Sequence, residues 1–309
     1  MRKKFTIFAS LFSRLPSRQP NFFVKLIGNY YHFMSESALG LFRELQRTKR
    51  LESLDCKIWY QGRYGKIVQM FSIHPIIEIP MVEPYLHNGL TLGKGIETIP
   101  HIRLSGPKMF RELVPMSKFL LNKIPATPQE PGITIIHRSE KRVYANEAEL
   151  VEKLKQFSMP IHIVQFENLS FVEQVNVARN TKLLIAPHGA GTINMIFMPE
   201  NSKIIEMFPK AYCPEHAKGI ADAFGHTLVA VEADGDFIAG RQPCPELQEY
   251  ITKNGCPTRD SLAQFQQWLD QHPNIDKREA FRVFRNVASF SLDPKRIITI
   301  AEKLISNFG

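Results

Sequence analysis

The sequence predicts an α/β fold whose C-terminal half is a doubly wound parallel sheet with helices on both faces. Short β-branched runs alternate with helical segments over about a hundred residues after position 132. The helical segments also carry start and stop signals, such as Ser170 with Glu173 three positions later, and Gly225 after the last helical residue. This alternation is typical of strand–helix–strand units, in which helices bury both faces of a parallel sheet.

The composition is that of a globular protein with a basic surface. Of 309 residues, 44% are hydrophobic and 22% are charged, which excludes disordered, collagen-like and coiled-coil chains. The net charge of +9 suits an anionic partner, whether a nucleotide phosphate, a lipid phosphate or a nucleic acid. The four cysteines are scattered and form no Cys-x-x-Cys pair, so reduced thiols are expected, not a disulfide framework or structural zinc.

A proline-rich linker over residues 125–132 divides the predicted domains. Pro125, Pro128 and Pro131 cannot continue a helix or a central strand. We expect an N-terminal α/β domain over 21–124, a C-terminal Rossmann-like domain over 133–258 and a helical tail over 259–309. Residues 1–20 form a basic, partly apolar arm, and two alternatives stay open: contact with an anionic membrane, or a frayed terminus. No stretch reaches the roughly 20 apolar residues of a membrane span.

Spacing of apolar residues predicts the individual elements of both domains. In the N-terminal domain we expect helices over Phe33–Leu45 and Met109–Leu121, and strands over Lys57–Tyr60, Ile67–Phe71 and Ile76–Ile79. In the C-terminal domain we expect strands over Ile133–His137, Ile161–Phe166, Leu183–Ala186, Lys203–Met207 and Thr227–Glu232. The helices between them are expected over Glu147–Phe157 with Asn146 as N-cap, Ser170–Ala178, near Ile193–Met198, and Pro214–Phe224. The tail helices are expected over Ser261–Gln271, Lys277–Ala288 and Pro294–Phe308.

Ionisable residues lie at the carboxyl ends of all five predicted strands of the C-terminal domain. They are His137 with Arg138, Glu167, His188, Glu206 and Glu232. Ligands of open parallel sheets bind in the crevice at the carboxyl ends of the strands. We therefore expect a polar ligand crevice here, although simple exposure to solvent would explain two or three of these residues.

The segment Ala186–Asn194 is the strongest local signal for a ligand. Gly189 and Gly191 let the backbone approach a ligand, and free amides at a helix start attract an anion, as in a pyrophosphate site. Asn194 stands where the dinucleotide-binding fingerprint has its third glycine, and the chain contains no Walker A pattern. It also lacks a Gly-x-Ser-x-Gly elbow, which argues against a hydrolase.

Other polar residues have positions that suit a nucleotide. The guanidinium groups of Arg138 and Arg142 could bind phosphate oxygens; the alternative is that both are loop residues exposed to solvent. Glu206 is placed to accept hydrogen bonds from ribose hydroxyls. The Asp234-Gly235-Asp236 string has the spacing of a metal-binding pair, but a tight turn is the preferred interpretation, and no metal site is predicted.

A candidate general base lies in the N-terminal domain. If Phe33 opens a helix, His32 and Glu36 lie one turn apart and share a face. Such a pair could hold an acceptor hydroxyl and its proton, since histidine titrates near neutral pH. A structural histidine is the alternative.

Together these motifs resemble glycosyltransferase family 61. The matching strings are Asn29-Tyr30-Tyr31-His32-Phe33, Arg138-x-x-x-Arg142-x-x-x-Asn146, Glu167-x-x-Ser170-Phe171-x-Glu173-Gln174, and His188-Gly189-Ala190-Gly191-x-x-Asn194 with Glu206 beyond. The resemblance covers roughly residues 29 to 209.

The resemblance implies a GT-B fold, with two Rossmann-like domains facing across a cleft, and an inverting hexosyl or pentosyl transferase. The nucleotide sugar would be UDP-linked, and the acceptor a glycan or lipid-linked glycan of bacterial capsule or lipopolysaccharide biosynthesis. His32, with Glu36 beside it, would serve the acceptor. The donor-binding residues would be Arg138, Arg142, Asn146, His188, Gly189, Ala190, Gly191, Asn194 and Glu206.

The expected location is cytoplasmic, with peripheral contact at the inner face of an anionic membrane. No cofactor is firmly predicted, and a divalent metal (Mn²⁺ or Mg²⁺) stays an open alternative that is not expected to be essential. One rival function is a catalytically inactive nucleotide- or sugar-binding relative. Another is a basic nucleic-acid-binding protein, but no nucleic-acid-binding signature supports it, and nucleic acid is not an expected partner.

Overall fold

The chain forms two compact units, Met1–Pro125 and Ala126–Gly309, each with its own parallel sheet. The computed structural model describes residues 21–24, 29–60, 62–78, 96–99, 107–210, 214, 216–234, 237–238, 243–254, 257, 261–277, 280–281, 283 and 287–306. The predicted arm over 1–20 lies outside the described residues, as do Cys213 and Cys256. The division between the units falls at the start of the predicted linker.

Unit 1 contains a four-stranded parallel sheet in the order β3-β2-β1-β4. The strands are β1 (Asn21–Val24), β2 (Lys57–Tyr60), β3 (Ile77–Glu78) and β4 (Ile96–Thr98). The sequence predicted β2 and the region of β3, but neither β1 nor β4. The order 3-2-1-4 is that of the first four strands of a Rossmann sheet.

The predicted helix over Phe33–Leu45 is part of a longer helical segment. It runs through α2 (Tyr30–His32), the π-helix η1 (Phe33–Ala38) and α3 (Leu39–Arg47). The second predicted helix, Met109–Leu121, is divided into α5 (Pro107–Arg111) and α6 (Leu113–Lys123).

The predicted strand over Ile67–Phe71 is wrong. This segment is helical, as α4 (Gly65–Val68) followed by the 3₁₀-helix η2 (Gln69–Phe71). Ile67, Val68 and Phe71 are all buried, and their spacing of one and four positions fits one face of a helix. Ile67 and Val68 are β-branched and favour a strand, but burial of one face of a helix outweighs that preference here.

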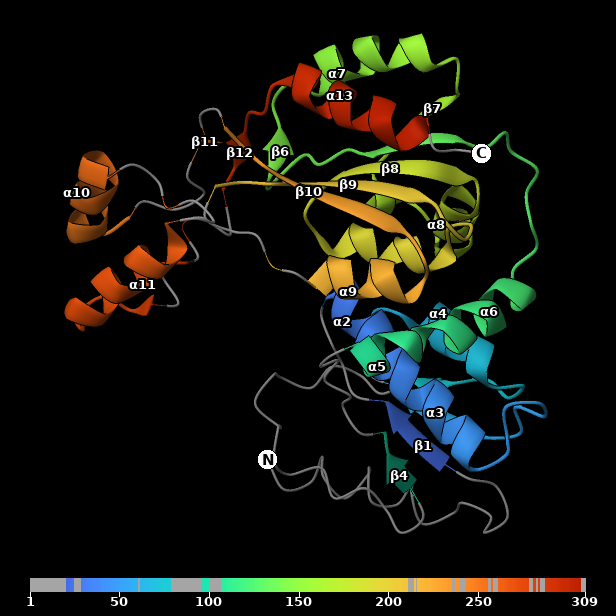
Figure 1. Ribbon diagram of the computed structural model, residues 1–309. Helices are drawn as coiled ribbons and strands as arrows, with labels where there is room; N and C mark the ends of the chain where they lie inside the picture. Colours follow the sequence, from blue (N-terminus) through green and yellow to red (C-terminus); the bar gives the residue numbers. More distant parts are fainter. Residues whose placement is uncertain are drawn as a thin grey trace. The chain divides into compact units, whose positions relative to one another are not determined.

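Unit 2 is built on a five-stranded parallel sheet in the order β10-β9-β8-β5-β7. All five predicted strands are confirmed, with shifted ends (Figure 1). They are β5 (Gly132–Ile136), β7 (Ile161–Val164), β8 (Thr181–Pro187), β9 (Lys203–Phe208) and β10 (Thr227–Glu232). Parallel sheets in both units confirm the predicted α/β class with two Rossmann-like domains. The cleft between the domains stays a prediction.

Helices cover both faces of this sheet. Figure 1 shows α7 (Glu147–Leu154) and α13 (Pro294–Ile305) on one face, and α8 (Phe171–Arg179) and α9 (His216–Ala223) on the other. The capping box of α8 is confirmed, because the Ser170 hydroxyl accepts from the Glu173 N–H and the Glu173 carboxylate accepts from the Ser170 N–H. Gly225 follows α9 with a φ of +72°, which glycine adopts without strain. Unit 2 also contains three 3₁₀ segments among its described residues: η3 (Lys155–Phe157), η4 (Phe166–Asn168) and η5 (Ala190–Phe197).

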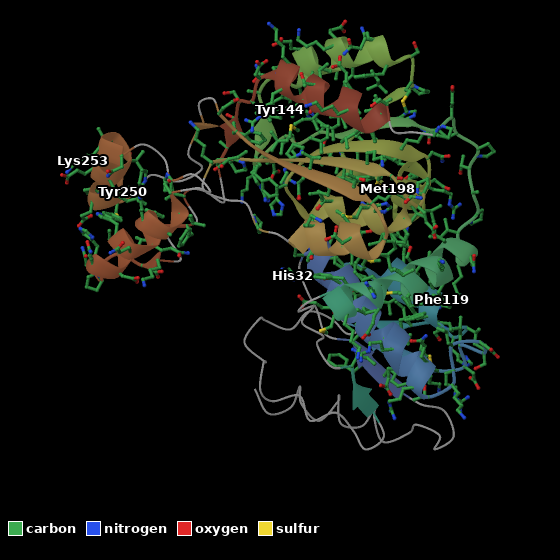
Figure 2. All side chains as sticks on the ribbon, in the orientation of Figure 1. His32, Phe119, Tyr144, Met198, Tyr250 and Lys253 are labelled. Atoms are coloured by element: carbon green, nitrogen blue, oxygen red, sulfur yellow. The ribbon has the colours of Figure 1, made fainter. Side chains whose placement is uncertain are left out.

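Helix α13 belongs to the core of unit 2, although the sequence predicts it in a tail after residue 258. Ile297, Ala301 and Leu304 lie in one hydrophobic cluster with strand residues such as Ile135 and Ile185. The Tyr144 hydroxyl donates a hydrogen bond of 3.0 Å to the Leu292 carbonyl just before α13, and Tyr144 is labelled in Figure 2. The C-terminal helix therefore stabilises the sheet that carries the strand ends.

The remaining elements, apart from β6, lie between β10 and α13 in the sequence. Helices α10 (Pro245–Asn254) and α11 (Leu262–Gln271) share a separate cluster with Leu247, Phe265 and Leu269 buried. A small sheet joins β11 (Phe237–Ile238), β12 (Ser289–Phe290) and β6 (Val143–Tyr144). The predicted helix over Lys277–Ala288 is described only in part, and β12 begins directly after it. Among the described helices, none has the length and apolar character needed to cross a membrane.

The buried His226 makes the stability of unit 2 dependent on pH. Its Nε2 lies 3.0 Å from the Met195 carbonyl, and its Nδ1 is buried without a hydrogen-bond partner among the described residues. Burial lowers the pKa of His226 below the usual 6.5. The unfolded chain therefore takes up a proton at a higher pH than the folded one, and stability falls as the pH drops below about 6.5.

We expect His226→Gln to reduce this loss, because the amide donates to the Met195 carbonyl and does not titrate. Urea unfolding at several pH values between about 7.5 and 5.5 measures the free energy of unfolding of both proteins. An identical pH dependence of the unfolding free energy in variant and wild type would rule out His226 as the cause.

Candidate functional site

The topology of unit 2 places a switch point between β5 and β8. From β5 the chain continues to β7 on one side, and it then crosses back to β8, β9 and β10 on the other side. Ligands of doubly wound sheets bind in the crevice outside the carboxyl ends of the strands at such a point. His137 and Arg138 follow β5, whereas His188 and Gly189 follow β8, so the strongest sequence signals meet at this point.

Arg138 lies against Gly189 across the switch point. A Cβ atom on Gly189 would collide with the Arg138 Nη1 atom, so only glycine permits the approach. The backbone of Gly189 is extended, with a φ of 174°, and the reason for glycine is therefore space and not conformation. Arg138 Nε donates to the Lys141 carbonyl at 2.7 Å, which holds the side chain in this position.

Arg138 is a half-buried cation without a carboxylate in ion-pair contact among the described residues. Desolvation by burial lowers the pKa of Arg138 from its usual value, and the negative charges of Glu167 and Glu140 oppose that shift. The guanidinium nevertheless stays charged at any physiological pH. A charge that is partly removed from water and has no carboxylate in ion-pair contact is stabilised by a bound anion.

The glycine turn itself is closed by local hydrogen bonds. The Thr192 hydroxyl donates to the Gly189 carbonyl at 2.7 Å, and the Thr192 N–H donates to the same oxygen at 3.2 Å. The turn leads into η5, which is a 3₁₀-helix and not the α-helix that the apolar run predicted. A Cβ on Gly191 would lie 3.2 Å from Phe166 and 3.4 Å from Ile136, so Gly191 packs closely against the ends of β5 and β7.

His188 is paired with Glu206 beneath the turn. The His188 Nδ1 lies 2.7 Å from the Glu206 Oε1, and the Glu206 residue is 1% exposed. The imidazole stacks on Phe208, with ring centroids 5.0 Å apart. Glu206 was predicted to bind ribose, and that contact stays a prediction; in the structure its carboxylate is bonded to the His188 ring.

Asn194 is bonded to another side chain, and its predicted contact with phosphates stays a prediction. Its side chain is buried, and its Nδ2 donates to the Gln174 Oε1 at 3.1 Å. Gln174 in turn donates to the carbonyls of Phe166 and Leu169. Asn194 therefore ties η5 to the loop after β7.

Arg142 and Asn146 lie between β5 and α7. Arg142 has a left-handed φ of 57°, and its N–H donates to the Val287 carbonyl at 2.8 Å. Asn146 precedes α7 as predicted but makes no side-chain capping bond. Its Oδ1 is buried without a hydrogen-bond partner among the described residues. A donor contact of these two side chains stays a prediction.

In unit 1, the predicted pair of His32 and Glu36 is formed. The His32 Nδ1 lies 2.6 Å from the Glu36 Oε1, and the His32 side chain is 50% exposed. Figure 2 labels His32. Asn29 caps the helix by accepting from the N–H groups of Tyr31 and His32. The π-helix η1 begins directly after His32, and π-helical turns are frequent at functional sites.

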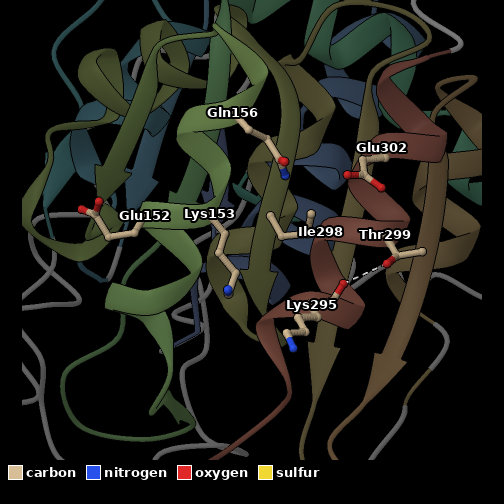
Figure 3. Close-up of a pocket in the computed structure, with 7 residues that line it drawn as sticks. All are labelled: Glu152, Lys153, Gln156, Lys295, Ile298, Thr299 and Glu302. Carbon is tan, nitrogen blue, oxygen red and sulfur yellow. Dashed lines mark hydrogen bonds between the residues drawn. The ribbon is translucent and has the colours of Figure 1, made fainter.

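One groove of about 480 Å³ lies away from the predicted site residues. It is lined by α7, the residue Gln156 of η3, and α13, as Figure 3 shows. Its lining is mostly charged or polar, and none of the predicted site residues belongs to it. In the part of the chain that the structure describes, no group of three or more His, Cys, Asp or Glu side chains could hold a metal ion. Asp234 instead pairs with Arg296 at 3.3 Å, and Asp236 lies outside the described residues.

A comparison with protein families decides the identity of the chain. The family model of Glycosyltransferase 61 matches residues 30–205, which is more than half of the sequence and includes His32, Arg138 and the glycine turn. The chain belongs to glycosyltransferase family 61. This confirms the family that the motifs resemble.

Curated relatives carry one activity in their names. The chain is 34% identical over 110 residues to protein O-linked-mannose β-1,4-N-acetylglucosaminyltransferase 2 of Xenopus tropicalis, which covers 34% of this chain and 19% of the relative. It is 27% identical over 182 residues to the protein of the same name from Canis lupus familiaris, covering 56% of this chain and 29% of the relative. The matches thus span less than a third of these relatives.

Two glycosyltransferase structures from E. coli also show similarity to the chain. The heptosyltransferase WaaC with ADP has 11% sequence identity and a TM-score of 0.43, over 70% of this chain and 93% of that chain. The dodecameric glycosyltransferase TibC of strain H10407 has 11% identity and a TM-score of 0.34, over 62% of this chain and 58% of that chain.

For this family 61 protein, we expect Gly189→Ala to weaken the binding of a nucleoside diphosphate by about tenfold or more. The new methyl group displaces the Arg138 guanidinium, and a charge-assisted hydrogen bond is worth about 1.5–3 kcal/mol. Because the collision involves only the end of a flexible side chain and the backbone is extended, the melting temperature should change little.

Gly65→Ala is the matched control, measured in the same calorimetric titrations. A Cβ on Gly65 collides with the end of the Glu78 side chain in unit 1, outside the candidate site. If the Gly189→Ala variant and the wild type bound the nucleoside diphosphate with equal affinity, that result would contradict the proposal that Arg138 binds an anion.

Proposed function

We propose that the chain transfers a sugar from a nucleotide-sugar donor, most simply a UDP-sugar, to a hydroxyl group of a glycan or lipid-linked glycan. The observation that carries this proposal is the half-buried Arg138, held against Gly189 at the switch point without a carboxylate in ion-pair contact among the described residues. Membership in family 61 supplies the reaction class.

The donor diphosphate binds at the carboxyl ends of β5 and β8 in this proposal. Arg138 donates to phosphate oxygens, and the amides of the turn from Gly189 to Gly191 contribute further donors. The same groups stabilise the negative charge on the diphosphate as it leaves the sugar. Glu206 supports the site by holding the His188 imidazole.

His32 acts as the general base of the proposed reaction. Glu36 is bonded to Nδ1, so that the ring accepts a proton at Nε2. The acceptor oxygen forms a bond to the anomeric carbon as the bond from that carbon to the phosphate oxygen breaks. The acceptor proton passes to His32 and the electron pair of the broken bond leaves with the nucleoside diphosphate, so a single displacement inverts the anomeric centre.

The sugar and the pathway are finer parts of the proposal. The names of the curated relatives support N-acetylglucosamine as the first donor sugar to test. The net charge of +9 supports an acceptor at an anionic membrane, as in capsule or lipopolysaccharide biosynthesis at the inner face of a cytoplasmic membrane.

Thermal unfolding in the presence of UDP, GDP, CMP and ADP, with and without Mn²⁺, tests the donor site. A nucleotide at about 100 times its Kd should stabilise the protein by about 2.7 kcal/mol. Stabilisation by one nucleotide identifies the donor class, and the Mn²⁺ samples show whether a metal contributes to binding. Absence of a shift with every nucleotide would contradict the donor site.

His32→Ala tests the base. We expect transfer from the donor identified above to fall by about a hundredfold or more, with unchanged affinity for the nucleoside diphosphate. His74→Ala is the matched control, because His74 also bonds a carboxylate, Asp55, at 2.8 Å in unit 1. A His32→Ala enzyme within tenfold of the wild-type rate would exclude His32 as the base. A wild-type protein that binds the nucleotide but transfers nothing would favour the inactive relative.

A further inference from the structure

A second histidine, His137, lies at the switch point and was not assigned to the donor site by the sequence. It directly follows β5, and its N–H donates to the Val164 carbonyl of β7 at 2.8 Å. Its side chain is 40% exposed, and its Nδ1 lies 2.8 Å from the Oε1 of Glu147, the first residue of α7. A loop histidine that is open to solvent yet fixed in orientation is well placed to meet a ligand.

The arrangement repeats the one at the end of the neighbouring strand. His188 follows β8 and bonds Glu206 through its Nδ1, as His137 bonds Glu147 after β5. Strands β5 and β8 are paired in parallel, with Ile135 opposite Ile185. Both histidines therefore lie at the carboxyl ends of adjacent strands.

Arg138 connects the two histidine positions. It follows His137 in the sequence, and its guanidinium lies against Gly189, which follows His188. Arg138 therefore links the two chain segments that carry the imidazoles. The other charged groups nearby are the carboxylates of Glu147, Glu140 and Glu167, of which the last two act on Arg138.

The hydrogen bond to Glu147 determines which ring nitrogen of His137 is available. With Nδ1 engaged by the carboxylate, Nε2 is left, and it has no hydrogen-bond partner among the described residues. In a ring that carries both protons, Nδ1–H donates to Glu147 and Nε2–H donates to an anion.

We propose that His137 is a further diphosphate-binding residue of the donor site and that Glu147 is its positioning residue. This inference rests on the proposed function and names the contact that a nucleoside diphosphate makes with the end of β5. Together with Arg138, it places hydrogen-bond donors of two adjacent residues on the leaving group.

Calorimetric titration of His137→Ala with the nucleoside diphosphate that binds the wild type, and with the matching nucleoside, tests the proposal. We expect about a tenfold loss of affinity for the diphosphate and none for the nucleoside, since a merely structural role would weaken both. Glu147→Gln should weaken diphosphate binding by a smaller factor, and the double variant should bind as His137→Ala does, because Glu147 acts through His137.

His162→Ala is the control, because His162 lies within β7 on the same sheet and contacts Gln129. Wild-type affinity of His137→Ala for the diphosphate, with binding lost in Gly189→Ala, would overturn this inference and leave the proposed function standing. Equal losses for diphosphate and nucleoside would also overturn it. A wild-type protein that binds no diphosphate would overturn the proposed function first, and this inference with it.

Discussion

The approach of Arg138 to Gly189 is the contact on which the candidate site depends. It joins the ends of two adjacent strands, β5 and β8, at the point where the order of the sheet reverses. Any side chain larger than hydrogen at position 189 would displace the guanidinium. A cation confined in this way, partly desolvated and without a carboxylate in ion-pair contact among the described residues, is stabilised when an anion binds. The site is thus electrostatically prepared for a phosphate group.

Carboxylates orient histidines at each of the positions that the proposed chemistry uses. Glu36 holds His32, Glu147 holds His137 and Glu206 holds His188, all through Nδ1 at 2.6–2.8 Å. The burial of the carboxylate differs among the pairs, because the side chains of Glu147 and Glu36 are 19% and 17% exposed, whereas that of Glu206 is 1% exposed. A buried carboxylate fixes its ring more firmly, since losing the partner would leave an uncompensated charge. This fits a fixed binding role for His188 and a proton-accepting role for the exposed His32.

Local sequence signals predicted most of the strands and helices of unit 2. In unit 1, two strands and one helical segment depend on contacts between distant residues and were not predicted. The β-branched strands and the capping box at Ser170 are properties of a few consecutive residues, and they are confirmed. β1 and β4 are short, and they form a sheet only through partners far away in the sequence: β1 pairs with β2, and with β4 across more than seventy residues. Ile67–Phe71 contains β-branched residues, but burial on one side of a helical turn outweighed that preference.

The candidate site shows the same limit. Spacing pointed to Arg138, Gly189 and His188, but it could not predict which side chains are bonded to one another. Asn194 and Glu206 are both buried and bonded to other side chains, and their contacts with a donor stay predictions. The partners Glu147 and Glu206 lie 10 and 18 residues from their histidines, and only the packing of the sheet brings them together.

A crystal structure with the bound nucleoside diphosphate tests the central claim most directly. The account predicts the diphosphate at the carboxyl ends of β5 and β8, in contact with Arg138 and the amides of the turn from Gly189 to Gly191. A nucleotide bound in the groove between α7 and α13, or anywhere that leaves Arg138 without a phosphate oxygen, would contradict it.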